Sequence, residues 1–175
     1  QALVGGNAFL LKPSERVPLT TLRLAEIFAE AGLPAGIFSL VQGGQPVVEA
    51  ICDHPGIAAF GFVGSTRVAR AVYARATAAG KRALCLGGAK NHLILVPDAD
   101  PEVAVENIVA SFTGCAGQRC MAASVLVAVG EVDPLLERIA QRAAALRLGE
   151  EMGPVTTAAA RDRIARAIGE AEADG

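Results

Sequence analysis

The sequence lacks the features of several common protein classes. It contains two histidines and no C-x-x-C pair, so neither a zinc site nor the disulfide framework of a small secreted protein is expected. No segment approaches the ~18 consecutive apolar residues that a membrane-spanning helix needs. A net charge of −2 and an isoelectric point near 5.7 provide no broad basic face for nucleic acid or an anionic membrane. A reducing compartment, the cytoplasm, is therefore the simplest expected location.

An initiating methionine and a signal-like N-terminal segment are also absent, because the chain opens with Gln1 and continues into an apolar run. We expect the true N-terminus to lie outside this sequence, which leaves targeting open. What the sequence does have is apolar content: 52% of its 175 residues are hydrophobic. That content is enough to form a buried core, in one domain or in parts of two.

Short β-type runs alternate with helical stretches along the whole chain, which predicts an α/β fold with a mainly parallel sheet. Strands are expected at 7–11, 39–41, 57–63, 82–86, 92–96 and 124–129. Helices are expected at 17–31, 46–52, 65–79, 101–112, 134–148 and 157–172. A glycine pair at 87–88 interrupts the pattern and is the expected domain boundary.

Cys120 lies in a glycine-rich segment, TGCAGQRCMA at 113–122. Only a thiolate is a strong nucleophile, and a neighbouring cation such as Arg119 favours the thiolate over the thiol. Gly114 and Gly117 would let backbone N–H groups approach a reacting oxygen. The alternative is that Cys120 is a small buried apolar residue at the start of the apolar stretch 121–129, as many free cysteines are. The segment alone leaves both interpretations open.

Two other turns could hold an anionic or hydroxyl-bearing ligand. Gly64 and Ser65 lie between a strand and a helix, where free N–H groups and the helix dipole favour a phosphate. The turn lacks the G-x-G-x-x-G pattern, however, and Ser65 could equally be an ordinary N-cap. Lys12 and Glu15 follow the first strand, at the edge of the sheet where α/β folds bind ligands. The alternative there is a solvated entry to a helix, with Pro13 fixing the turn.

Taken in order, these segments resemble the aldehyde dehydrogenase superfamily along nearly the whole chain. The resemblance is carried by GN at 6–7 with KPSE at 12–15, AGLPAG at 31–36, FVGST at 62–66, LGG at 86–88, GQRC at 117–120 and MGP at 152–154. Within the superfamily, GGAKNH at 87–92 and RCMA at 119–122 are similar to the CoA-acylating methylmalonate-semialdehyde dehydrogenase branch. The resemblance implies a partial NAD-binding, Rossmann-like domain at 1–86. It implies the start of the α/β catalytic domain, with the nucleophile loop, at 87–175.

The resemblance also implies roles for individual residues. Cys120 matches the nucleophile, and Arg119 matches the arginine that grips a substrate carboxylate, for which a planar guanidinium fork is suited. Lys12 and Glu15 match the pair that holds the adenosine ribose, and a carboxylate there favours NAD over NADP. The full set of implied cofactor-binding residues is Lys12, Ser14, Glu15, Gly64, Ser65, Val68 and Gly87. No metal is implied.

One departure from the superfamily is important for the chemistry. Hydrolytic members carry a glutamate before Leu-Gly-Gly that activates water, whereas here Cys85 or Leu86 takes its place, depending on the alignment. Neither side chain can act as a general base for water at neutral pH. The acyl acceptor is then expected to be the thiol of coenzyme A. Two smaller departures are Ala69, where many relatives have glycine, and Cys115, where many hydrolytic members have asparagine.

The expected function is therefore NAD-dependent oxidation of a semialdehyde acid, methylmalonate or malonate semialdehyde, to an acyl-CoA through a Cys120 thioester, with loss of CO2. One alternative is a hydrolytic aldehyde dehydrogenase of broad specificity. The other is a truncated domain without activity that at most binds nucleotide, because the superfamily is much longer than this chain. For the full-length protein the resemblance implies a homo-oligomer, a dimer or tetramer.

Overall fold

The computed structural model describes all residues from Gln1 to Gly175. Its strands are β1 (Phe9–Leu11), β2 (Phe38–Leu40), β3 (Ala59–Val63), β4 (Arg82–Leu86), β5 (Asn91–Leu95) and β6 (Ala123–Ala128). Its α-helices are α1 (Pro18–Glu30), α2 (Gln45–Asp53), α3 (Thr66–Ala78), α4 (Pro101–Thr113), α5 (Asp133–Ala144) and α6 (Ala158–Asp174). A short 3₁₀ helix, η1 (Gly114–Gly117), follows α4 directly.

The strands form three parallel pairs, β1 with β2, β3 with β4, and β5 with β6. Each pair is connected by a crossover that contains a helix, which is the arrangement a βα repeat produces. The predicted parallel α/β fold is therefore confirmed. The chain divides into two compact units, Gln1–Gly88 and Ala89–Gly175. The assignment of the first to cofactor binding and the second to catalysis stays a prediction.

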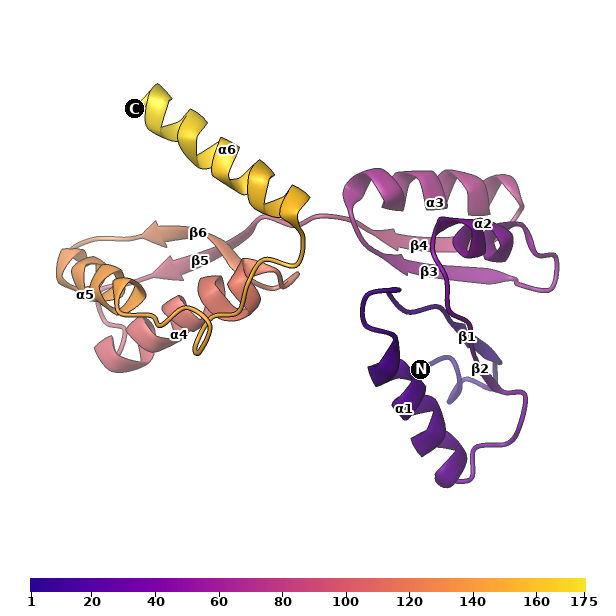
Figure 1. Cartoon of the computed structure of the whole chain (residues 1–175). Coiled ribbons are helices and arrows are strands. Elements are labelled where there is room, and N and C mark those ends of the chain that lie inside the picture. The colour runs from indigo at the N-terminus through magenta and orange to yellow at the C-terminus, as the bar shows by residue number, and fades with distance from the viewer. The chain divides into compact units, whose positions relative to one another are not determined.

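In the first unit, α2 and α3 cover one face of the β3–β4 pair (Figure 1). Strand residues alternate between faces, so Phe60 and Phe62 of β3 point toward these helices. They pack around Cys52, Val72 and Ala76, which are buried. In the same unit, α1 contributes no buried residue, although the sequence predicts an apolar face for it. The two-stranded β1–β2 pair is too narrow to cover a helix of 13 residues.

In the second unit, α4 and α5 lie along one face of the β5–β6 pair (Figure 1). This face holds the larger of the two cores. Its buried members are Leu95, Val105, Ile108, Val109, Val132, Leu135 and Ile139. The core anchors α4 and β6, the two elements between which the Cys120 segment runs, so it fixes both ends of that segment.

Side-chain caps begin three helices, at the predicted Ser65 and also at Asp100 and Thr157. The Asp100 carboxylate accepts a hydrogen bond from the Val103 backbone N–H (2.9 Å), and Pro101 fits the first helical position because it needs no partner there. Helix α5 ends at Ala144, earlier than the predicted 148, because the chain turns there and forms an isolated bridge between Leu148 and Met152. None of the helices combines the length and the apolar character needed to cross a membrane.

Truncation of a core residue in α4 should destabilise the second unit. Ile108→Ala removes a side chain that is 4% exposed, and such changes cost about 2–5 kcal/mol because they leave a cavity. Val103→Ala, at a position 58% exposed on the same helix, should change the free energy of unfolding by less than about 0.5 kcal/mol. Urea denaturation followed by circular dichroism measures both, and equal losses would contradict the core as described.

Candidate active site

The segment with Cys120 leaves α4 at Thr113, passes through η1 and enters β6 at Ala123. Cys120 itself is exposed, and the following Met121 is 80% exposed. The interpretation of Cys120 as a buried apolar residue is therefore wrong for this structure. The thiol is accessible, as a nucleophile requires. The backbone N–H of Cys120 has no acceptor within the chain, so it is free to donate to a reacting oxygen.

Gln118 fixes the segment on the side that precedes Cys120. Its Nε2 donates to the carbonyl oxygens of Cys115 (2.8 Å) and Pro154 (3.4 Å). Its Oε1 accepts from both the backbone N–H (2.9 Å) and the hydroxyl (2.8 Å) of Thr156. One side chain thus ties the nucleophile segment to residues 154–156. Sequence reasoning did not single out Gln118, because contacts across 38 positions leave no local pattern.

Asn91 holds the same segment on the other side of Cys120. It is the first residue of β5, and its Nδ2 donates to the carbonyl oxygens of Cys120 (2.8 Å) and Ala122 (3.0 Å). The backbone contributes one further contact here, from the Ala122 N–H to the Arg119 carbonyl (3.0 Å). Asn91 was also missed by sequence reasoning, which placed it in the GGAKNH motif without a role of its own.

Arg119 does not extend freely into solvent from the segment. Its Nη2 donates to the Ala110 carbonyl near the end of α4 (2.6 Å), and its guanidinium lies directly against Gly114. A Cβ at position 114 would lie 1.7 Å from Nη2, so any larger residue would displace the guanidinium. The structure thus gives Arg119 a role in supporting the segment. A role in binding a substrate carboxylate, with its remaining N–H groups, stays a prediction.

The backbone before Gln118 is unusual at Cys115 and Ala116, which both have φ of 53°. Left-handed conformations of residues other than glycine cost on the order of 1 kcal/mol, and asparagine adopts them most readily. Gly117 continues the left-handed path with φ of 71°. The chain therefore turns sharply just before the nucleophile.

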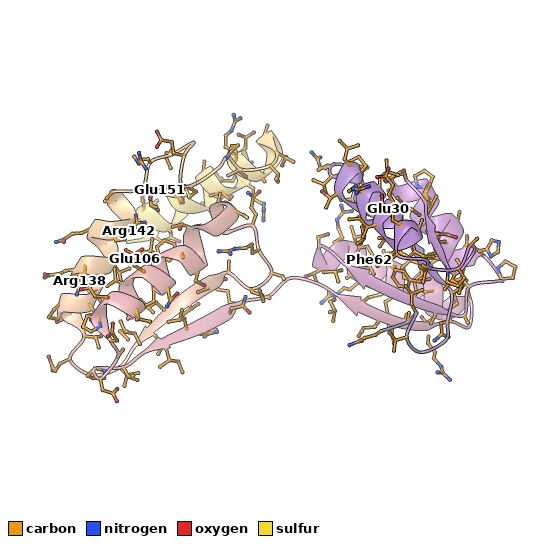
Figure 2. The ribbon with its side chains drawn as sticks, turned by 90° about the horizontal axis from the view of Figure 1, so that it is seen from below. Glu30, Phe62, Glu106, Arg138, Arg142 and Glu151 are labelled. Atoms are coloured by element: carbon orange, nitrogen blue, oxygen red, sulfur yellow. The ribbon has the colours of Figure 1, made fainter.

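Ion pairs connect α4, which precedes the Cys120 segment, to α5 and to the turn at Glu151. Arg142 of α5 lies between Glu106 of α4 and Glu151 (Figure 2). Its Nε is 3.0 Å from Oε1 of Glu106, and its Nη2 is 3.2 Å from Oε1 of Glu151. The Glu151 carboxylate also accepts from the backbone N–H of Arg147, and this hydrogen bond lowers the pKa of Glu151 below its ordinary value. Glu151 therefore stays ionised and holds the turn that leads to Thr156, the partner of Gln118.

The predicted ribose-binding residues lie together in the first unit. Lys12 directly follows β1, and its Nζ donates to the Gly43 carbonyl (2.7 Å) in the turn after β2. The same ammonium lies 3.7 Å from the Glu15 carboxylate. The backbone N–H of Glu15 and the charge of Lys12 lower the pKa of Glu15, so the carboxylate is ionised at neutral pH. Ser14 accepts a hydrogen bond from the backbone N–H of Arg16 (3.3 Å).

The other predicted cofactor-binding residues lie where β3 and β4 end. Ser65 caps α3, since its hydroxyl accepts from the backbone N–H of Val68 (3.4 Å). The Gly64 N–H donates to the Leu86 carbonyl (3.1 Å), which brings the two strand ends together. A Cβ at Gly87 would lie 2.9 Å from Cα of Thr66, so only glycine fits there. The N-cap is thus present, while phosphate binding at this turn stays a prediction.

Two of the four thiols pack in the core of the first unit, Cys52 fully buried and Cys85 partly buried. Cys52 is 1% exposed, and burial raises its pKa above the ordinary value. Cys85 packs against the same core, and burial raises its pKa as well. The alternation of β4 directs Leu86 to the opposite face, where it is 51% exposed. Neither position of the missing glutamate therefore provides a base, and Cys115 and Cys120 are the accessible thiols.

An open hollow of about 510 Å³ lies beside η1, α5 and α6. Its lining is mainly apolar and includes Phe112, Ala116, Met152 and Ile164, but neither Cys120 nor Arg119. It is therefore not a candidate site for the aldehyde. No group of three or more histidine, cysteine, aspartate or glutamate side chains lies close enough together to hold a metal ion.

Comparisons with known proteins identify the family. The model of the aldehyde dehydrogenase family matches residues 1–175. Malonate-semialdehyde dehydrogenase 1 of Geobacillus kaustophilus is 51% identical over 87% of this chain, which covers 31% of that protein. Malonate-semialdehyde dehydrogenase 2 of Geobacillus thermodenitrificans is 48% identical over 99% of this chain, which covers 38% of that protein.

Solved structures agree with this result. A Sinorhizobium meliloti protein described as a methylmalonate-semialdehyde dehydrogenase, complexed with NAD, superposes with a TM-score of 0.91 at 48% identity. Methylmalonate-semialdehyde dehydrogenase from Oceanimonas doudoroffii superposes with a TM-score of 0.90 at 42% identity. In both cases 99% of this chain matches 37% of the other. The chain thus spans little more than a third of the relatives it matches, and it belongs to the aldehyde dehydrogenase family.

Proposed function

We propose that this chain contributes the nucleophile and part of the NAD site to an aldehyde dehydrogenase that converts malonate or methylmalonate semialdehyde to an acyl-CoA. The observation that carries the proposal is the exposed Cys120, in a segment fixed by side-chain amides before and after it. The similarity to malonate-semialdehyde dehydrogenases supports the substrate class. The full-length protein is expected to be a cytoplasmic homo-oligomer.

The residues of the first unit fit a dinucleotide. The ionised Glu15 carboxylate can accept hydrogen bonds from ribose hydroxyls, and its charge repels the 2′-phosphate of NADP. The turn at Gly64 and Ser65 aims the start of α3 toward a phosphate. Val68, 37% exposed in the first turn of this helix, offers an apolar surface to the adenine. NAD, when bound, supplies the hydride acceptor.

The chemistry at Cys120 begins with addition of its thiolate to the aldehyde carbon, which forms a C–S bond and turns the carbonyl oxygen into an oxyanion. The backbone N–H of Cys120, which has no acceptor within the chain, would donate to that oxyanion. Loss of hydride from the same carbon re-forms the carbonyl as a thioester. The negative charge on oxygen drives this step, and Cys120 remains acylated until a second nucleophile arrives.

Release of the acyl group should depend on a thiol. With Cys85 facing the core and Leu86 on the other face of β4, no carboxylate is available at these positions to activate water. The thiolate of coenzyme A adds to the thioester carbonyl, and the Cys120 thiolate leaves. The β-carboxylate of the acyl group departs as CO2, its electron pair passing to the α-carbon, which then takes a proton from solvent. The products are acetyl-CoA or propionyl-CoA.

Loss of the nucleophile should abolish turnover. In the complete enzyme, Cys120→Ser should lower kcat for malonate semialdehyde by more than about a thousandfold and should prevent formation of the acyl-enzyme, because an alcohol is far less readily ionised than a thiol. Cys115→Ser makes the same change at the other exposed thiol of the segment and should retain kcat within about threefold. Stopped-flow absorbance of NADH measures both, and a Cys120→Ser enzyme with intact turnover would rule out the assignment.

Turnover should require coenzyme A. In its absence, the complete enzyme should produce about one equivalent of NADH per active site and then stall, because the thioester has no acceptor. Addition of coenzyme A should restore steady NADH production with one acyl-CoA formed per NADH. Steady turnover with a free carboxylic acid as product would instead support a hydrolytic enzyme.

Replacement of Arg119 separates its two candidate roles. If the guanidinium binds the substrate carboxylate as well as supporting the segment, Arg119→Leu should raise KM for malonate semialdehyde about tenfold more than it raises KM for propanal. If Arg119 only supports the segment through the Ala110 carbonyl, both aldehydes should suffer equally. Initial rates for the two aldehydes distinguish these results, and an equal effect removes Arg119 from substrate binding.

A further inference from the structure

We propose that Asn91 is the positioning residue for Cys120, with a role that rests on Cys120 being the nucleophile. Its side-chain amide donates to the carbonyl of Cys120 itself and to that of Ala122. The first of these bonds fixes the peptide group that directly follows the reacting residue. Fixing that peptide restricts rotation about the Cα–C bond of Cys120, and so restrains the side chain and the backbone N–H on the same Cα relative to the anchored carbonyl.

Backbone pairing between β5 and β6 does not by itself fix the peptide group that follows Cys120. Asn91 lies opposite Ala123, but the next residue, His92, lies opposite Val125, so the register shifts at this point. Residues 118–122, which lead directly into β6, lie outside any strand. A primary amide carries two N–H bonds, so the Asn91 side chain can donate to the Cys120 and Ala122 carbonyls at once. It thereby holds residues that no strand pairing reaches.

Cys120 would otherwise be weakly held. The preceding backbone adopts left-handed conformations at Cys115, Ala116 and Gly117, and Cys120 itself is exposed and has no core contacts. Gln118 anchors the segment two residues earlier, and the bond from the Ala122 N–H to the Arg119 carbonyl is the one backbone hydrogen bond that spans Cys120. Among side chains, Asn91 is therefore the direct hydrogen-bond partner of the Cys120 backbone. Oxyanion donors act only within a few tenths of an ångström of their proper position.

Two labelling reactions separate positioning from accessibility. Acylation of Cys120 by p-nitrophenyl acetate passes through an oxyanion and needs the thiolate and the N–H aligned. Alkylation by iodoacetamide forms no oxyanion and needs only an exposed thiol. The site of each modification is established by peptide mass spectrometry, with Cys115 as the internal reference for exposure. The complete protein that carries this chain is used throughout.

In Asn91→Leu, both hydrogen bonds are lost at nearly constant volume. The acylation rate constant of Cys120 should fall about tenfold or more, whereas its alkylation rate should change less than about threefold. Asn91→Asp keeps the shape but places a carboxylate against two carbonyl oxygens, and it should lose at least as much acylation. Asn107→Leu is the matched control, because Asn107 is exposed on α4 and makes no hydrogen bond to the segment. It should acylate at the unsubstituted rate.

The outcomes are distinct. Unchanged acylation of Cys120 in the Leu or the Asp variant overturns the positioning role and leaves the proposed function intact. A parallel fall of acylation and alkylation in both variants also overturns it, since that result marks a general loss of structure. Failure of the unsubstituted protein to acylate at Cys120 overturns the proposed function and the positioning role together. A selective loss of acylation in both variants supports the proposal.

Discussion

The site depends on a topological constraint: the chain must pass from the end of α4 to the start of β6 and still present Cys120 to solvent. A tightly packed connection would bury the thiol, and a loose one would leave it without a defined direction. The structure resolves this with side-chain amides, Gln118 before the cysteine and Asn91 after it. The core beneath α4, α5 and β6 holds the two ends, so the amides need to fix only the few residues between them.

The same structure accounts for the choice of acyl acceptor in the proposed mechanism. Water is a poor nucleophile at neutral pH without a base, whereas a thiol reacts readily with a thioester through its thiolate. Cys85 is turned into an apolar core and Leu86 carries no ionisable group, so β4 provides no base. The alternation of the strand turns the Cys85 thiol toward the core, and the exposed neighbour on the other face is an aliphatic leucine.

Much of this could be predicted from the sequence because the signals are local. The parallel α/β fold and the cap at Ser65 follow from strand alternation and capping residues, whereas the exposure of Cys120 is one of two interpretations that the glycine-rich segment leaves open. The roles of Gln118 and Asn91 could not be predicted, because a side-chain amide that bonds across 29 to 38 positions leaves no periodic pattern. The bond from Arg119 to α4, and the early end of α5, likewise depend on tertiary contacts.

The central claim, that Cys120 carries the acyl group, is tested most directly by trapping the intermediate. The complete enzyme is mixed with malonate semialdehyde and NAD without coenzyme A, quenched in acid and digested for peptide mass spectrometry. We expect a stoichiometric acyl adduct on the peptide containing Cys120, absent from Cys115 and removed when coenzyme A is added before the quench. NADH formation with an adduct on another residue, or with none, would contradict it.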